Sequence, residues 1–582
     1  KDGMSGLLVR GGSNDQTQIL YDEVPIYNQA HAYGLLSIFS GETVQSAEVS
    51  KGYISPAYGS RLSALTQIRT REGDRQHHRQ SLTVGTLSLA GTADGPLVRG
   101  KGSYLVSARY FFPEAVLAAV GNSVRFGFHD ITGKLSYDVH RSHTLSLGVY
   151  TGDDRMRNAD EGAENSFGWG NTTASLRLRS RWREGLGSTA VVYYSFLQNR
   201  QQAEYREDGS VNEGKTTFRT HEFGARMTFD HRLSEHYALE YGASFSAQRF
   251  LPMHTRAVVE GQERETEYPA SQLLSGALFV NNRLQWGSWR ADLGVRGALY
   301  DNADDTAFAL EPRAQLSYDF GRDRAVWASA TLNSQALVQF NRYYYSMPID
   351  FWTPFRDGRL QRAWQVALGG RMKLHERLTL SLETYYKRMR NLPMIYDSDD
   401  FLLGRDGFVY GTGWAFGVEA MLQWQTDRLS LTASYTYTNS RRRSDGVTYP
   451  FEYDIPHDFN TFMSYDVVKQ PDRGRRHTFS LNVSWRTGLP YRLTNTAYPD
   501  SDGNPIFGIT PYPTMRMRNY FRTDISYNME RRKRNGVRNW QFSILNATWH
   551  KNPVSIYPHR GTYKATVLIP IMPSISYTRT FK

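Results

Sequence analysis

Cysteine is absent from the 582 residues of this sequence. Its absence excludes a disulfide framework, a thiolate metal site and a thiol nucleophile. It leaves the cellular compartment open, since disulfides are only one of several ways to stabilise a large protein.

Long apolar runs are missing as well. No stretch approaches the roughly 18 apolar residues that a membrane-spanning helix requires, and the most helix-like segment, PEAVLAAVG at 113–121, is too short. No signal peptide is visible, and the chain opens in mid-pattern with KDGMSGLLVRGG. We therefore expect a further portion upstream.

Motifs of known chemistry are also lacking. The sequence has no GxSxG and no HExxH, and its 15 histidines are scattered. An enzyme is disfavoured, although a catalytic group assembled from distant strands leaves no local motif. The 69 Lys and Arg residues exceed the 57 Asp and Glu residues by 12. They are spread along the chain without a nucleic-acid-binding motif, so the charge favours anionic ligands or an anionic lipid surface over nucleic acid.

What the sequence does contain is alternation. From about residue 78 onward, segments of ten or so residues place apolar and polar side chains in turn, as in LTLSLETYYK at 378–387. In 174–183, Leu176, Leu178 and Trp182 share one face and four arginines share the other. This period of two predicts β-strands, either in a soluble sandwich or in a membrane barrel.

The connections between these segments favour the barrel. Short turns recur at 94–102, 139–143, 183–188, 231–236, 284–289, 320–324, 374–377, 425–428, 469–476 and 530–538. They alternate with long connections such as 151–168, 336–361 and 487–516. With a hairpin near 84–87, this gives eleven loops on one side and ten turns on the other, and hence about 22 antiparallel strands.

A closed ring of this size spans a membrane without a helix, because every backbone group is paired around the circle. Tyrosine and tryptophan near strand ends, as in 191–196 and 539–543, suit interfacial girdles. A lumen of roughly 22 strands requires a plug. The predicted fold class is therefore an all-β membrane protein, a 22-stranded antiparallel transmembrane barrel with a plug in its lumen.

The opening stretch carries a specific resemblance. It runs from VRGG at 9–12 through ILYDEVPIYN at 19–28 and AEVSKGYISPAYGSRLS at 47–63 to LTQIRTREGD at 65–74. This stretch resembles the second half of the plug domain of TonB-dependent outer-membrane transporters, in the branch that often carries a carboxypeptidase-regulatory-like domain upstream. Later segments, such as 411–422, 453–467 and 572–581, resemble barrel segments of the same branch.

The resemblance implies two parts, the C-terminal half of the plug at 1–75 and the transmembrane barrel with long extracellular loops at 76–582. It implies the outer membrane of a Gram-negative bacterium, with both chain ends in the periplasm and the TonB–ExbB–ExbD complex as the energy source. The TonB box and the first half of the plug are expected upstream. Glu23, Tyr53 and Ser60 stand where the family commonly has glycine, which puts the turn geometry after Asp22 in question because glycine adopts positive φ easily.

Two groups of residues are candidates for the function. Charges inside a crowded lumen need partners, so we expect Arg10, Asp22, Lys51 and Arg61, with the Gly11–Gly12 turn, to tie the plug to the barrel. Alternatively, these charges are merely solvated. In 342–355 the aromatic residues Tyr343, Tyr344, Tyr345 and Trp352, together with Phe355, suit stacking on a sugar, peptide or siderophore; alternatively, they pack the loop against its neighbours.

No cofactor is required by this scheme. The segment DSDGN at 500–504 resembles part of a calcium loop, which makes Asp500, Asp502 and Asn504 weak candidates for structural calcium, but the distal bidentate glutamate is missing.

The predicted function is TonB-dependent active import of a scarce solute, a siderophore, oligosaccharide or peptide, gated by the plug. The expected partners are outer-membrane lipids, the TonB complex and the solute, with a surface lipoprotein as a further candidate. Two alternatives share the barrel: a passive porin, and a surface receptor or adhesin that does not transport.

Overall fold

The structure is a computed structural model that describes residues 7–119, 125–160, 163–207, 210–259, 261–342, 349–394, 409–492, 494–499, 505–509, 512–559, 562–567 and 571–581. In these segments, no helix combines the length and the apolar character needed to cross a membrane.

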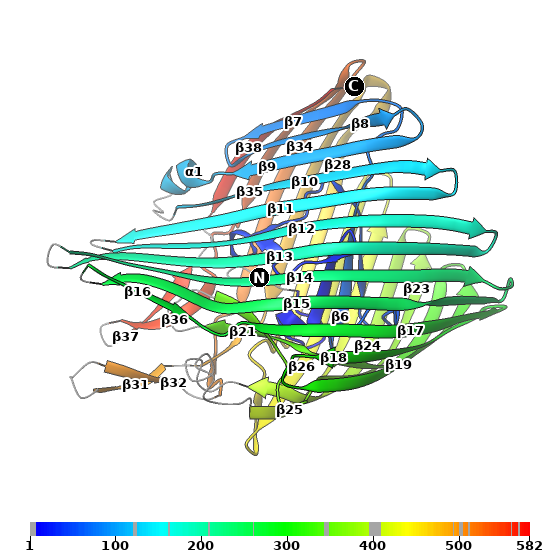
Figure 1. Cartoon of the computed structure of the whole chain (residues 1–582). Coiled ribbons are helices and arrows are strands. Elements are labelled where there is room, and N and C mark those ends of the chain that lie inside the picture. The colour runs from blue at the N-terminus through cyan, green and yellow to red at the C-terminus, as the bar shows by residue number, and fades with distance from the viewer. Residues whose placement is uncertain are drawn as a thin grey trace.

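A closed antiparallel barrel dominates the architecture (Figure 1). In the described part of the chain 22 strands run around the ring, and β38 closes it by pairing with β7, so that Phe581 lies opposite Gln80. Two short strands, β16 (Gln262–Glu267) and β27 (Val447–Pro450), pair with the far ends of β15 and β26. The predicted fold class is confirmed.

The barrel strands are β7 (Arg79–Gly85), β8 (Ser88–Val98), β9 (Gly102–Phe111), β10 (Arg125–His140), β11 (His143–Asp160), β12 (Ala163–Arg183), β13 (Leu186–Glu207), β14 (Ser210–Arg232), β15 (Tyr237–Val259), β17 (Ser271–Trp286), β18 (Trp289–Asp301), β19 (Thr306–Gly321), β20 (Arg324–Gln335), β23 (Gln361–His375), β24 (Leu378–Met394), β25 (Val409–Gln425), β26 (Leu429–Ser444), β28 (His457–Gln470), β29 (Arg475–Arg486), β34 (Tyr520–Lys533), β35 (Gly536–Leu545) and β38 (Met572–Phe581).

The short turns gather at one end of the ring, as the sequence predicts, but the alternation with long connections is not strict: at the other end only 86–87, 208–209 and 302–305 separate β7 from β8, β13 from β14 and β18 from β19. We call the end with the short turns the turn end and the other the loop end. One predicted connection differs: most of 151–168 is paired strand, because β11 continues to Asp160 and β12 begins at Ala163. Polar residues suit a strand that continues past the membrane into water, so the polar composition of this segment did not mark the end of the strand.

Smaller elements lie in the connections between the barrel strands. They are α1 (Glu114–Ala119), the 3-10 turn η3 (Pro471–Arg473), and the hairpins β21 (Leu337–Arg342) with β22 (Ile349–Pro354), β30 (Pro490–Tyr491) with β33 (Met515–Arg516), β31 (Thr494–Pro499) with β32 (Pro505–Ile509), and β36 (Pro553–His559) with β37 (Thr562–Val567).

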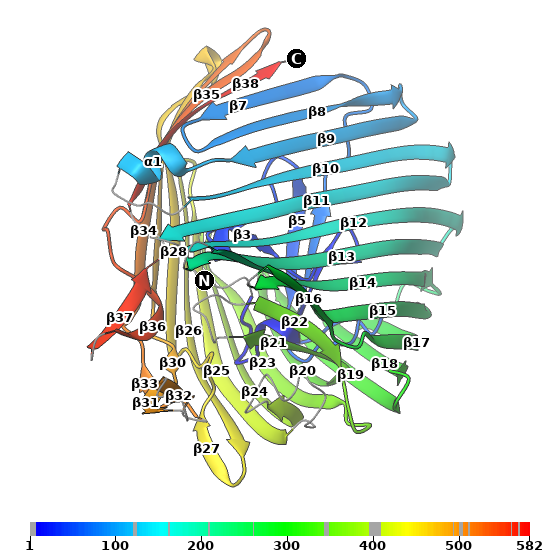
Figure 2. The same ribbon diagram turned by 60° about the vertical axis from the view of Figure 1, so that its left-hand side comes forward.

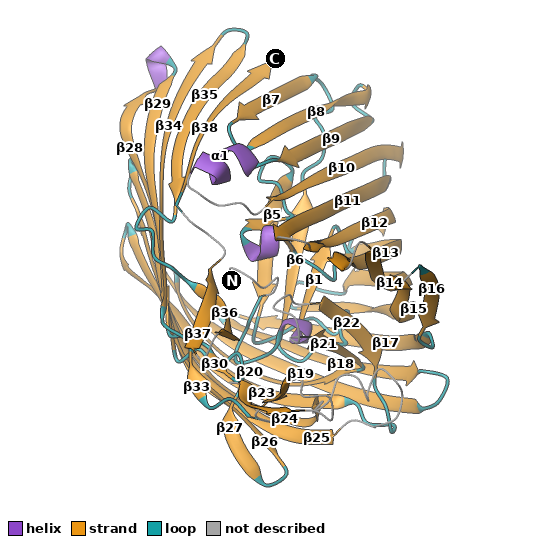
Figure 3. Cartoon of the chain, turned by 90° about the vertical axis from the view of Figure 1, so that its left-hand side faces the viewer, coloured by secondary structure: helices purple, strands orange, loops and turns teal. Residues whose placement is uncertain are grey.

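A small mixed sheet lies inside the barrel, where the wall strands surround it (Figures 2 and 3). Its strand order is β2-β1-β6-β5, with β1 and β6 parallel. The elements of this part are η1 (Asn14–Gln16), β1 (Thr17–Tyr21), β2 (Val24–Pro25), β3 (Ala30–His31), η2 (Ala32–Gly34), β4 (Leu36–Ser37), β5 (Val44–Ser50) and β6 (Ala64–Thr70). We call residues 7–75 the plug; the predicted division at 75 falls in the connection between β6 and β7.

Two of the three unusual residues of the plug adopt the backbone that glycine favours. Glu23 has φ 75° and Ser60 has φ 71°, and Asp22 beside Glu23 has φ 46°. The turn therefore keeps the geometry expected of a glycine, although a residue with a side chain is conformationally strained at positive φ.

The outer face of the wall is apolar. Leu176 on β12, Val192 on β13 and Leu278 on β17 are among many large apolar side chains that point away from the lumen and stay exposed. Their neighbours along the strand, such as Ser175 and Val191, are buried against the interior. An exposed apolar belt around a closed sheet is what contact with lipid requires.

We expect Val192→Arg to weaken the folded barrel. Val192 is 60% exposed on the outer face, and an arginine in the middle of the bilayer costs about 2–4 kcal/mol. Urea unfolding in lipid vesicles measures the loss, with Val192→Leu as the apolar control. Equal stability of the two variants would mean that this face is not in hydrocarbon.

Candidate functional site

Arg10 is the centre of an ionic cluster between the plug and the wall. Its guanidinium contacts Glu383 of β24 and lies 3.6 Å from the Glu419 carboxylate of β25. Lys51 Nζ lies 2.9 Å from the same Glu419 carboxylate, and Arg10 Nη1 donates to the Lys51 carbonyl oxygen at 3.1 Å. Burial lowers the pKa of Arg10, and the charge of Glu419 opposes this shift. The structure thus brings Arg10 and Lys51, which the sequence nominated separately, to one pair of carboxylates.

The two carboxylates explain why the cluster matters. Glu383 and Glu419 stand directly opposite each other on adjacent strands, an arrangement that is destabilising for like charges. With the plug in place, two cations face two anions. The plug therefore neutralises a part of the wall that would otherwise repel itself.

Arg10→Gln should loosen the plug. Arg10 is only 4% exposed, and removing one partner of a buried ion pair costs about 3–5 kcal/mol because the remaining charge stays buried. Native-state proteolysis of the plug measures the change. The double variant Arg10→Gln/Glu383→Gln should recover a large part of the loss; no recovery would show that the two side chains are not coupled.

The glycine pair next to Arg10 makes a close backbone contact with the wall. The Gly11 carbonyl oxygen accepts hydrogen bonds from Ser440 Oγ at 3.1 Å and from Arg442 Nη2 at 3.2 Å, both on β26. Gly11 has φ 64°, and a Cβ at this position would collide with Ala415 and Ser440. The approach of the chain to the wall requires glycine here. A Cβ at Gly12 would instead collide with Ser63 inside the plug.

Asp22 ties two parts of the plug together and also reaches the wall. Its carboxylate accepts hydrogen bonds from the backbone N–H of Thr70, at 2.9 Å, and from the Thr70 hydroxyl. Lys134 Nζ of β10 lies 3.5 Å from the Asp22 carboxylate. Beside it, Glu23 pairs with Arg226 of β14, a tie that the sequence analysis missed because Glu23 was considered only for its backbone.

Arg61 lies elsewhere. Its guanidinium carbon is 5.2 Å from the centre of the Trp352 ring, and its Nη1 donates to the Ser60 carbonyl oxygen of its own segment. In the described part of the chain it makes no ion pair with a wall strand. Arg61 therefore faces the hairpin at the loop end and not the barrel wall.

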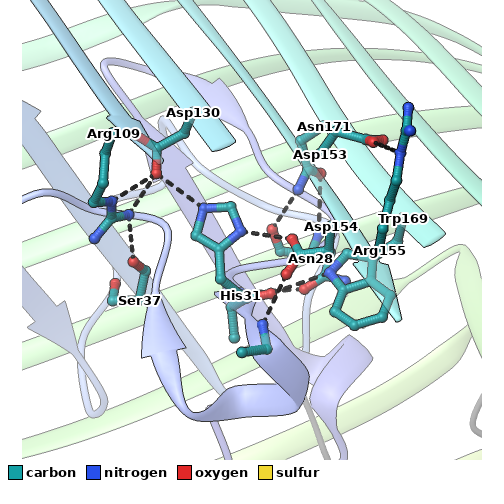
Figure 4. A network of polar contacts seen from close by, with 12 residues as sticks. Asn28, His31, Ser37, Arg109, Asp130, Asp153, Asp154, Arg155, Trp169 and Asn171 are labelled. Atoms are coloured by element: carbon teal, nitrogen blue, oxygen red, sulfur yellow. Dashed lines mark hydrogen bonds and ion pairs between the residues drawn. The ribbon is translucent and has the colours of Figure 1, made fainter. Parts of the chain in front are cut away.

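A histidine that the sequence analysis treated as ordinary forms a second cluster (Figure 4). His31 Nδ1 lies 2.6 Å from Asp154 of β11, and His31 Nε2 lies 3.1 Å from Asp130 of β10. The ring stacks on Phe128 with centroids 3.9 Å apart. Arg109 of β9 pairs with the same Asp130 carboxylate at 2.5 Å. No local pattern in the sequence marks His31, because its partners are about a hundred residues away.

The two aspartates favour the charged form of His31. Burial by itself lowers the pKa of His31, but hydrogen bonds to Asp130 and Asp154 outweigh burial and raise the pKa above its ordinary value of 6.5. Tyr150, whose hydroxyl lies 3.4 Å from Nε2, is a further titratable neighbour. In the protonated form both ring nitrogens donate, and the imidazolium bridges β10 and β11.

The attachment of the plug should therefore depend on pH. Because the folded pKa of His31 is raised, its contribution to stability is complete below about 6.5 and is lost as the pH rises through the folded value. Each unit of pKa shift corresponds to about 1.4 kcal/mol. Hydrogen exchange of residues 30–38 over a pH series measures the effect.

His31→Gln should remove this dependence, whereas His375→Gln, at an exposed position on β23, should preserve it. If wild type and His31→Gln show the same pH profile, His31 does not carry the effect.

The aromatic residues of the hairpin β21–β22 lie between the plug and the loops. Trp352 is 5% exposed and Phe355 is 2% exposed. Trp352 packs edge-on against Tyr27 of the plug, with ring centroids 5.2 Å apart, and the Phe355 carbonyl oxygen accepts a hydrogen bond from Asn302 Nδ2 at 2.6 Å. In this conformation, both side chains pack. Tyr343, Tyr344 and Tyr345 lie outside the described residues.

A small cavity separates this hairpin from the plug. Arg61 and Trp352 line it together with Asn14, Thr17 and Tyr27. In the described part of the chain, Trp352 Nε1 and Arg61 Nε are buried without a hydrogen-bond partner. Buried donors without partners are rare, and the cavity, with a volume of about 20 Å³, has room for a water molecule that could pair with them.

No group of three or more His, Asp or Glu side chains in the described segments is placed to hold a metal ion. Asp500, Asp502 and Asn504 lie outside those segments, so structural calcium there stays a prediction.

Comparisons with known proteins extend these observations. The family model described as TonB dependent receptor-like, beta-barrel matches residues 110–548. No curated protein sequence matches the chain.

Solved structures share the fold. One is the receptor FpvA of P. aeruginosa bound to heterologous pyoverdines, with 13% identity and a TM-score of 0.72, covering 98% of this chain and 80% of that one. Another is BauA, the ferric preacinetobactin receptor from Acinetobacter baumannii, with 12% identity and a TM-score of 0.68, covering 98% and 89%. The ferric citrate transporter FecA in its unliganded form has 14% identity and a TM-score of 0.69, covering 100% and 92%.

Proposed function

The chain belongs to the TonB dependent receptor-like β-barrel family, and from this membership we propose that it actively imports a scarce solute across the outer membrane of a Gram-negative bacterium. The family consists of receptors and transporters and not of enzymes. The solute binds at the loop end, and the plug gates its passage.

The proposed orientation places the loop end outside the cell and the turn end, with both chain ends, in the periplasm. Energy comes from the TonB–ExbB–ExbD complex, which pulls on the plug. A surface lipoprotein that covers the loop end stays a prediction.

The observation that carries the proposal is how the plug is held. Besides apolar contacts such as that of Leu62 with Met389, it is held by polar ties to five wall strands: Arg10 reaches β24 and β25, Glu23 reaches β14, and His31 reaches β10 and β11. Ion pairs and hydrogen bonds can exchange their partners for water at a modest net cost, whereas a tightly packed apolar interface could not. An attachment of this kind resists spontaneous release and yields to an applied force.

Ligand binding must favour the state in which the plug is released, since a ligand with equal affinity for two states shifts nothing. Trp352, Phe355 and the three tyrosines at 343–345 remain our candidates for ligand contact. Because Trp352 and Phe355 are buried, contact requires the hairpin β21–β22 to move. Arg61 at the same cavity suits an anionic group of a siderophore, oligosaccharide or peptide.

A passive porin and a non-transporting surface receptor are the alternatives. A porin requires an open lumen, and the ties from Arg10, Glu23 and His31 hold the plug inside it. A receptor that only binds its ligand has no need for the plug to move. Movement of the plug is therefore the property to test.

An engineered bridge tests this movement, and the chain without native cysteine is a clean background for it. A Cβ at Gly52 of the plug would lie 3.0 Å from Ser329 Oγ of β20, close enough for a disulfide. We expect oxidised Gly52→Cys/Ser329→Cys to bind its solute but to lose import, and reduction to restore it.

Mass spectrometry of small molecules that co-purify with the protein identifies the solute. The accumulation of this solute in cells is then measured with and without TonB. The single cysteine variants are the controls. Import that continues through the bridged protein would contradict plug gating, and import independent of TonB would indicate a porin. Binding without any import in the wild type would indicate a surface receptor.

A further inference from the structure

A cavity at the turn end carries an excess of positive charge. It has a volume of about 1010 Å³ and extends along the wall from the β10–β11 turn to the start of β18. Seven arginines and two carboxylates, Asp230 and Glu235, are among the described residues that line it. No plug residue is part of this lining.

The cavity opens into the lumen and not toward lipid. Arg177 of β12 lies 3.9 Å from Glu72 of the plug, so its side chain points inward. Arg179 and Arg181 share its face because side chains alternate along a strand. Leu178 and Trp182 on the other face are 37% and 56% exposed. The cavity therefore lies next to the plug, toward the turn end.

Two of the arginines are neutralised by the wall. Arg283 Nη2 lies 2.5 Å from Glu240, and its Nη1 lies 3.5 Å from Asp230. Arg290 Nε lies 3.1 Å from Asp292.

The other five arginines of the lining are not neutralised in this way. Within the described segments, no carboxylate lies at ion-pair distance from these arginines, which are Arg141, Arg179, Arg181, Arg183 and Arg232. Arg183 Nη2 is instead 3.4 Å from His231 Nε2. A concave surface with an excess of one charge sign concentrates counter-ions.

The strand register gives the cavity room. Arg179 stands between Thr144 of β11 and Thr189 of β13, so its neighbours on both adjacent strands have short side chains. Arg181 faces Gly187, which has no side chain to fill the space. The planar guanidinium fork matches carboxylate and phosphate groups in two-point contacts.

We propose that this cavity is a binding site for small multivalent anions that carry carboxylate or phosphate groups. It lies at the opposite end of the lumen from the proposed ligand loops. It therefore goes beyond the proposed function, and anion binding does not depend on it. The anion is either a solute that leaves the plug or a free anion of the adjacent compartment.

Calorimetric titration of the purified protein in neutral detergent at low ionic strength tests the site, with citrate and inorganic pyrophosphate as probes. We expect saturable binding to the wild type and an affinity at least tenfold weaker in Arg179→Gln/Arg181→Gln. The matched control, Arg322→Gln/Arg324→Gln, removes the same charge from the exposed β19–β20 turn and should stay within twofold of wild type. Arg179→Lys/Arg181→Lys keeps the charge without the fork and should give an intermediate affinity.

Tighter binding of citrate supports the carboxylates of a solute as the source, and tighter binding of pyrophosphate supports a phosphate. Absence of saturable binding to the wild type overturns the proposal, as does equal weakening in the two glutamine pairs, which indicates nonspecific attraction. If Arg179→Gln/Arg181→Gln does not fold, the single variant Arg181→Gln, at an exposed position, is titrated instead. An affinity at least threefold weaker than that of the wild type supports the proposal, and an unchanged affinity overturns it.

Discussion

Backbone hydrogen bonding in hydrocarbon constrains everything else in this protein. A strand in lipid has no water to satisfy its N–H and C=O groups, so the sheet must close on itself, and β38 pairs with β7 to do so. The 22 strands of the described ring enclose a lumen wide enough to leak unless it is filled. The plug, the polar inner wall and the ties between them all follow from that closure.

The inner wall and the plug complete each other electrostatically. Glu383 and Glu419 stand opposite each other on the adjacent strands β24 and β25, and Arg10 and Lys51 from the plug neutralise them. Asp130 and Asp154 hold His31 from two sides in the same way. At these two clusters the wall supplies the carboxylates and the plug the cations, whereas Glu23 of the plug pairs with Arg226 of the wall in the opposite sense. The interface is strong as a set of charged pairs, yet each pair can be exchanged for water.

The two ends of the lumen differ in chemistry. At the loop end, Trp352 and Arg61 close a small cavity against the plug with aromatic and cationic groups. At the turn end, arginines such as Arg179 and Arg181 line a much larger cavity, and no plug residue is part of its lining. A solute that crosses this lumen would move from an aromatic environment to a strongly basic one.

The sequence by itself determined the strands, their number and their two faces, because the alternation of side chains and the lengths of connections are local properties. It also nominated Arg10 and Lys51 as ties, since a charge in a lumen needs a partner. It could not find that partner: Glu383 is hundreds of residues from Arg10 in the chain, and only closure of the barrel brings them together. The polar composition of 151–168 likewise gave no sign that these residues are paired strand. Pairing of β11 with β12, and of β12 with β13, extends the sheet beyond the membrane, and only the tertiary structure shows that pairing. His31 became a charged bridge only where the plug packed between β10 and β11, because the pKa of a side chain depends on the groups that folding places around it.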